Sequence, residues 1–224
     1  MGHDIELTAS DHFRLGGYRA DPAGAAKGAL VVIQEIFGVN HHIRNVCDRY
    51  ARQGYVAVAP SIFDRIEPNF KSGYSPDEVA VARKFVANPN WDAMLRDVQA
   101  AIDSVKHVGP VGVVGFCLGG SVAFVAAVKL SGLRAAVGYY GGAIARFAAD
   151  RPKVPTLLHF GGKDTGIPLS DVEAIRAKRP DVEIHVYPDA QHGFSCDERA
   201  SYDKTSADLA GQRTLAFFAR HLAV

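Results

Sequence analysis

The chain has 224 residues, 48% of them hydrophobic and 22% charged, which is typical of a globular protein with a sizeable core. Its 25 basic and 24 acidic residues leave a formal net charge of +1, which excludes an electrostatic footprint for nucleic acid or an anionic membrane. No apolar run approaches the roughly 20 residues that span a bilayer, and charges near the start replace the apolar stretch of a signal peptide. We therefore expect one domain over 1–224, cytoplasmic, with no nucleic-acid or membrane partner.

Apolar, β-branched runs alternate with helix-period segments along the chain. In chain order the pattern predicts an antiparallel edge hairpin over 4–19, a strand over 30–33, a helix over 43–51, a strand over 55–58, a long loop over 60–76, a helix over 95–105, a strand over 111–114, a helix over 118–130, strands over 135–139 and 156–160, a helix over 167–178, a strand over 182–187 and a closing helix around 215–222. This alternation predicts an α/β fold with a mainly parallel twisted sheet and helices on both faces.

The segment Gly-Phe-Cys-Leu-Gly-Gly at 115–120 joins a predicted strand to an apolar helix. It is the G-x-S-x-G nucleophile elbow of α/β-hydrolases with Cys117 in place of serine. A sharp turn there lifts the side chain above the sheet, and the first N–H groups of the helix favour a thiolate and a developing oxyanion. A small buried cysteine in a Gly-rich turn is the structural alternative. The strand before and the apolar helix after favour the nucleophile.

Two later loops supply an acid and a base in the order that α/β-hydrolases use. Asp164 follows the strand over 156–160, and His192 follows the strand over 182–187. His192 can take the Cys117 proton and return it to the leaving group, while Asp164 orients the imidazole. Asp189 is the competing acid, in second place because it precedes the histidine in the same loop.

With these motifs in place, the sequence resembles the dienelactone hydrolases (carboxymethylenebutenolidases). The similarity is carried by the blocks at 34–40, 115–120, 136–141 and 161–164 and by the loop around His192. It implies an α/β-hydrolase fold, a Cys–His–Asp triad and a role for Glu35, whose side chain in this family pairs with the thiol at rest. It also implies an oxyanion hole formed by the backbone N–H groups of Leu118 and Ile36.

Family members that act on dienelactone carry two arginines that hold the substrate carboxylate. Arg83 is a rough match to the first, and no arginine matches the second, because Gly-Phe-Ser-Cys follows His192. Arg199, further along, is either a contributor or a solvated helix-start residue. The natural substrate therefore stays open. The other candidate substrate-binding residues are the aromatic side chains Phe37, Trp91 and Tyr139.

Other conspicuous residues indicate no further chemistry. The adjacent pair His41 and His42 suits a cap or a surface position better than a metal site, because neighbouring residues diverge on a helix. Cys47 lies on an apolar helical stripe and is expected in the core. No phosphate loop or dinucleotide motif is present, so neither a metal nor a cofactor is expected.

The leading interpretation is a cofactor-independent hydrolase of small carboxylic esters or lactones that forms an acyl-thioenzyme. A thioesterase or an amide hydrolase on the same triad is an alternative, as is a non-hydrolytic thiol redox sensor on this fold. A sensor thiol needs neither an acid nor a base loop, so the two loops favour catalysis. We expect a monomer or a small homo-oligomer with a small-molecule substrate.

Overall fold

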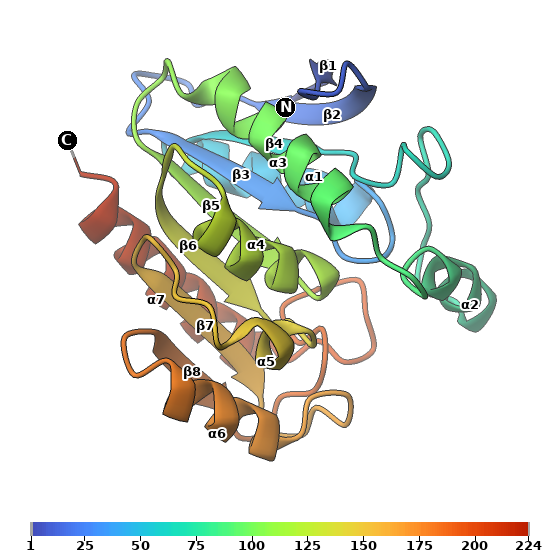
Figure 1. The fold of residues 1–224 in the computed structure, drawn as a ribbon, viewed down its shortest axis with the longest axis vertical. Helices are drawn as coiled ribbons and strands as arrows, with labels where there is room; N and C mark the ends of the chain where they lie inside the picture. Colours follow the sequence, from blue (N-terminus) through green and yellow to red (C-terminus); the bar gives the residue numbers. More distant parts are fainter. Residues whose placement is uncertain (1, 224) are drawn as a thin grey trace.

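The computed structural model describes residues 2–223, and its centre is an eight-stranded sheet (Figure 1). The strand order is β1-β2-β4-β3-β5-β6-β7-β8. The strands are β1 (His3–Thr8), β2 (Arg14–Ala20), β3 (Ala29–Ile33), β4 (Val56–Pro60), β5 (Val111–Phe116), β6 (Leu133–Tyr139), β7 (Thr156–Gly161) and β8 (Glu183–Tyr187). β2 pairs antiparallel with β1 and β4, and the remaining pairs are parallel. The expected edge hairpin and the mainly parallel sheet are both confirmed.

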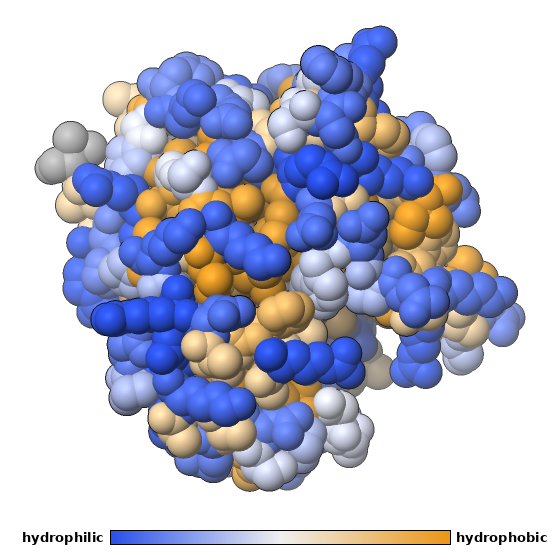
Figure 2. Space-filling model, viewed as in Figure 1, coloured by the Kyte–Doolittle hydropathy of each residue, from blue (hydrophilic) through white to orange (hydrophobic). Residues whose placement is uncertain are grey.

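Helices cover both faces of this sheet. They are α1 (His41–Arg52), α2 (Pro76–Lys84), α3 (Trp91–Val105), α4 (Leu118–Lys129), α5 (Ile144–Phe147), α6 (Leu169–Lys178) and α7 (Lys204–His221). In the view of Figure 1, α3 and α4 lie in front of the sheet and α1 and α7 lie behind it. Apolar side chains gather in the middle of the front face, with polar residues around them (Figure 2). Among the described helices, none is long and apolar enough to cross a membrane.

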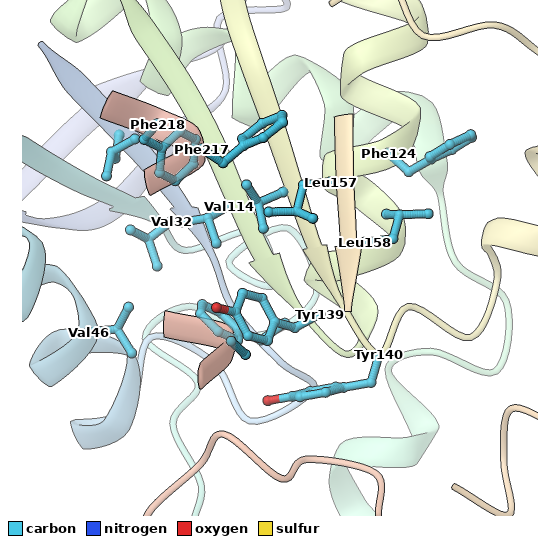
Figure 3. Close-up of a cluster of buried hydrophobic side chains, with 14 of the residues drawn as sticks. Val32, Val46, Val114, Phe124, Tyr139, Tyr140, Leu157, Leu158, Phe217 and Phe218 are labelled. Atoms are coloured by element: carbon cyan, nitrogen blue, oxygen red, sulfur yellow. The ribbon is translucent and has the colours of Figure 1, made fainter. Parts of the chain in front are cut away.

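The alternation of side chains along the central strands divides the core between the two faces. In β3, Leu30 and Val32 pack with the cluster that contains α1 and α7, whereas Val31 packs with the cluster that contains α3 and α4. Figure 3 shows Val32, Val46 of α1 and Phe218 of α7 in the first cluster. Because both faces are covered, these strands are apolar throughout, as the sequence pattern indicated.

Two helices were not predicted, α2 and the four-residue α5. α2 begins where the long loop ends, and a capping box between Ser75 and Glu78 starts it. Ala82 is its one fully buried residue, so the helix has almost no apolar period for a sequence pattern to detect. Its stability comes from the cap and from Pro76 in the first turn, which are local features.

The parallel strands place their carboxyl ends at one edge of the sheet, where ligand sites of α/β proteins form. The segments that follow β3, β5, β6, β7 and β8 meet at this edge. These segments contain every residue that the sequence assigned to the triad, the oxyanion hole and Glu35.

Candidate active site

Cys117 lies between β5 and α4 with φ 55° and ψ −116°, a conformation that non-glycine residues rarely adopt. The flanking glycines make this turn possible. A Cβ on Gly115 would lie 1.8 Å from the carbonyl oxygen of Gly119, and a Cβ on Gly119 would lie 2.3 Å from that of Ile33. The strand and helix therefore approach too closely for any other residue, and the sulfur is carried on a strained, well-defined turn.

The structure brings the three predicted triad residues into one hydrogen-bonded chain. His192 Nε2 lies 3.1 Å from Cys117 Sγ, and His192 Nδ1 lies 2.7 Å from Asp164 Oδ2. Asp164 is buried, and its other carboxylate oxygen accepts a hydrogen bond from the Gly166 N–H at 2.8 Å. The competing acid, Asp189, is exposed and forms an ion pair with Lys163 at 2.7 Å instead.

The surroundings of His192 favour its charged form. Burial alone would lower the pKa of His192, but the hydrogen bonds that its ring makes to Asp164 and Cys117 outweigh burial, and the pKa is raised above its ordinary value. His192 Nε2 lies 3.1 Å from the sulfur, within reach of the Cys117 proton. The other thiols lack this partner: burial raises the pKa of Cys47 far above its usual range, and burial together with the charge of Glu35 raises that of Cys196 to about 12.

The two backbone N–H groups predicted to form the oxyanion hole have no acceptor among the described residues. Within the described residues, neither Leu118 nor Ile36 donates its backbone N–H to a hydrogen bond. The Gly119 N–H donates to the Gln34 carbonyl at 3.1 Å, which ties the start of α4 to the loop that contains Ile36. The two free donors belong to the segments that follow β5 and β3, as an oxyanion hole in this fold requires.

Glu35 is 1% exposed, and its expected contact with the thiol is not in the structure. Its Oε1 instead accepts a hydrogen bond from Arg199 Nη1 at 3.0 Å. Its Oε2 has no hydrogen-bond partner within the described residues. Arg199 is therefore not a solvated helix-start residue: it neutralises a buried carboxylate. Gly193 leaves room for it, because a Cβ there would lie 2.4 Å from the Arg199 guanidinium.

Residues 15–222 match the model of the dienelactone hydrolase family. The chain belongs to this family. It is 36% identical to a candidate carboxymethylenebutenolidase of Synechocystis, covering 99% of this chain and all of that one, and 33% identical to the carboxymethylenebutenolidase of Pseudomonas putida, covering 96% and 95%. The crystal structure of a candidate dienelactone hydrolase from Klebsiella pneumoniae superposes with a TM-score of 0.86 at 30% identity, covering 98% and 99% of the two chains.

The family and the structural match confirm the α/β-hydrolase fold and the resemblance found in the sequence. They also establish the chain as a hydrolase of the ester and lactone class.

The four predicted substrate-binding residues of this dienelactone hydrolase family member differ from one another in burial and contacts. Phe37 is buried, with Arg199 over its ring, whereas Arg83 is exposed on α2. Trp91 packs edge-to-face against Phe147, and Tyr139 is buried with its hydroxyl 2.6 Å from that of Thr214. The hydroxyl of Tyr139 is thus used in the core, and substrate contact by the other three residues stays a prediction.

Tyr140 is a site residue that the sequence reasoning missed. Its ring centre lies 5.1 Å from that of His192, and its hydroxyl lies 2.8 Å from that of Ser195. A φ of 37° turns it away from the direction of β6. Its place directly after the strand beside the nucleophile strand is the signal that could have identified it.

His42 lies in the core rather than at the surface, because α1 presents it inward beside Phe116. Its Nδ1 lies 3.2 Å from Asp197, and Glu198 is close enough for the three side chains to hold a cation. However, the Arg49 guanidinium already forms an ion pair with Asp197 at 3.3 Å. A positive charge in the donor set disfavours a metal, so the cluster is best described as an ion-pair network between α1 and residues 197–198.

Proposed function

We propose that this protein hydrolyses small carboxylic esters or lactones through Cys117, by way of an acyl-thioenzyme. The observation that carries the proposal is the continuous chain from Asp164 through His192 to the Cys117 sulfur. Such a chain is what activation of a thiol requires: a base within reach of the nucleophile and a third group that orients the base.

The reaction proceeds in two steps. The Cys117 thiolate attacks the carbonyl carbon, and the resulting oxyanion accepts hydrogen bonds from the Leu118 and Ile36 N–H groups. The tetrahedral intermediate collapses, the C–O bond breaks, and His192 protonates the departing alkoxide, which leaves an acyl group on sulfur. His192 then removes a proton from water, the hydroxide displaces the sulfur, and the carboxylic acid and the free thiol are restored.

Asp164 and Glu35 influence the charged groups that form in this reaction, the His192 imidazolium and the Cys117 thiolate. The Asp164 carboxylate fixes the imidazole with Nε2 toward the sulfur and stabilises the imidazolium. Glu35 adjusts the charge near Cys117, since a carboxylate beside a thiol disfavours a standing thiolate. The ion pair with Arg199 offsets part of this negative charge, so the strength of the pair sets how far Glu35 opposes the thiolate.

The protein's own groups supply every proton transfer in this scheme, so it needs no metal or organic cofactor. A thioester or an amide bond is the alternative substrate class, because either can form the same acyl-thioenzyme. The three cysteines are free thiols, which supports a reducing cytoplasmic setting.

The experiment is a panel of lactones, aryl esters, thioesters and anilides offered to the wild type and to Cys117→Ala. Ester or lactone turnover that disappears in the variant is the expected result. Preferred turnover of thioesters or anilides would favour the alternatives, and equal turnover by both proteins would refute the mechanism.

A further inference from the structure

A cavity of about 380 Å³ lies between α1 and α7, behind the strand that carries the nucleophile. Its floor includes Phe116 and Tyr139, and Ser195 forms part of its wall. Figure 3 shows Val46 of α1, another lining residue, across from the ring of Tyr139. None of the triad residues lines it within the described chain. The volume is that of a small-molecule pocket.

The wall formed by α7 includes two small residues about one turn apart, Ala207 and Gly211, together with Asp208, Gln212 and Leu215. A Cβ added to Gly211 would have no heavy atom within 4 Å. Glycine within a helix destabilises it relative to alanine, and α7 has 18 residues with Gly211 near the middle. The sequence therefore keeps this space open although a larger residue would fit and would strengthen the helix.

The rim of the cavity carries one unpaired cation. Arg49 and Arg52 both contribute from the last turn of α1; Arg49 is paired with Asp197, whereas Arg52 has no side-chain partner within the described residues. The acidic lining residue Asp208 is bound to Lys204 at 2.5 Å. An aromatic floor beneath guanidinium groups suits a flat apolar body that carries one carboxylate.

The floor and wall are joined to the catalytic groups. The Cys117 N–H donates to the Tyr139 carbonyl at 3.0 Å. The Ser195 hydroxyl lies 2.8 Å from that of Tyr140, whose ring contacts His192. An occupant that moves Tyr139 or Ser195 therefore moves groups next to the nucleophile and the base.

We propose that this cavity is a second ligand site, which binds a small aromatic or alicyclic carboxylate and changes turnover at Cys117 when occupied. The effect on turnover rests on the proposed function, and carboxylates of this class are also what ester hydrolysis releases. The binding itself does not depend on catalysis.

The test is calorimetric titration of the Cys117→Ala protein with benzoate and, as a neutral control, benzamide. Gly211→Leu extends a side chain into the cavity from a position where an added Cβ meets no heavy atom within 4 Å, and Ala219→Leu is the matched change on the exposed side of α7. We expect saturable binding of benzoate, weakened about tenfold or more by Gly211→Leu and unchanged by Ala219→Leu. Arg52→Gln should weaken benzoate and leave benzamide unchanged.

Absence of saturable binding, or equal affinity in Gly211→Leu, would overturn the site, as would benzamide binding as tightly as benzoate. In the active enzyme, benzoate should alter ester hydrolysis by the wild type and not by Gly211→Leu. If benzoate binds but changes ester hydrolysis equally, or not at all, in the two proteins, the proposed effect of the cavity on turnover is overturned. Failure of the Cys117 mechanism would appear separately, as an ester hydrolase activity that survives Cys117→Ala.

Discussion

Replacing either partner of the ion pair between Glu35 and Arg199 should destabilise the fold, and the loss should be larger when Arg199 is replaced. The pair has an N–O distance of 3.0 Å, with side-chain exposures of 1% for Glu35 and 21% for Arg199. Its gross attraction at an effective dielectric constant of about 20 is about 5 kcal/mol. Arg199→Met leaves a carboxylate buried without its partner, which costs about 3–5 kcal/mol. Glu35→Gln leaves a guanidinium that water can reach and an amide oxygen that still accepts, so it costs about 1–2 kcal/mol.

Thermal unfolding, followed by the fluorescence of the one tryptophan, Trp91, measures both changes, with Arg213→Met as the control for loss of an arginine. In a chain of this length we expect the midpoint of thermal unfolding to fall by roughly 6–20 °C in Arg199→Met and roughly 2–8 °C in Glu35→Gln. The deficit of Arg199→Met should be smaller at pH 5 than at pH 8, because an unpaired buried carboxylate takes up a proton. Equal losses, or a larger loss in Glu35→Gln, would refute the reasoning.

The same pair predicts opposite effects on the thiol. Glu35→Gln removes a negative charge near Cys117 and should speed its alkylation at neutral pH, while ester turnover falls because charge control is lost. Arg199→Met leaves that charge without neutralisation and should slow alkylation. Unchanged alkylation and turnover in both variants would mean that Glu35 only fills the core.

Two further predictions concern the triad. Asp164→Asn should lower kcat/KM strongly while Asp189→Asn leaves it near the wild-type value, and steady-state kinetics with the reverse order would show that the acid is misassigned. His192→Ala removes the base within reach of the thiol, so it should slow alkylation of Cys117 by iodoacetamide and reduce turnover by roughly 10²–10⁴-fold. Peptide mapping should find Cys196 unmodified at neutral pH, and modification of Cys196 at an equal rate would contradict its raised pKa.

The sequence was sufficient for the central strands β3 to β7 because they are buried on both faces and are therefore apolar runs. The meeting of Cys117, Asp164 and His192 was also predictable, since chain order and strand ends place all three at one edge of a parallel sheet. Both inferences depend on local patterns and on topology rules that hold across the fold class.

Long-range side-chain partners could not be predicted in this way. Glu35 and Arg199 are 164 residues apart in sequence, and their contact depends on how the segment after His192 folds back over the loop after β3. The contact between buried His42 and Asp197 of that segment joins residues 155 apart in sequence. Tyr139 and Tyr140 are adjacent and alike in sequence, and the turn at Tyr140 decides which of them contacts His192.

The acyl group on sulfur is the most direct test of the account. The enzyme is mixed with an excess of an aryl acetate, quenched in acid within the first turnovers and digested, and the peptides are measured by mass spectrometry. We predict an acetyl group on the peptide that contains Cys117, at a level that rises in the burst phase and falls after the substrate is consumed. Substrate turnover with no acyl group at Cys117, or with the acyl group on another residue, would contradict the mechanism.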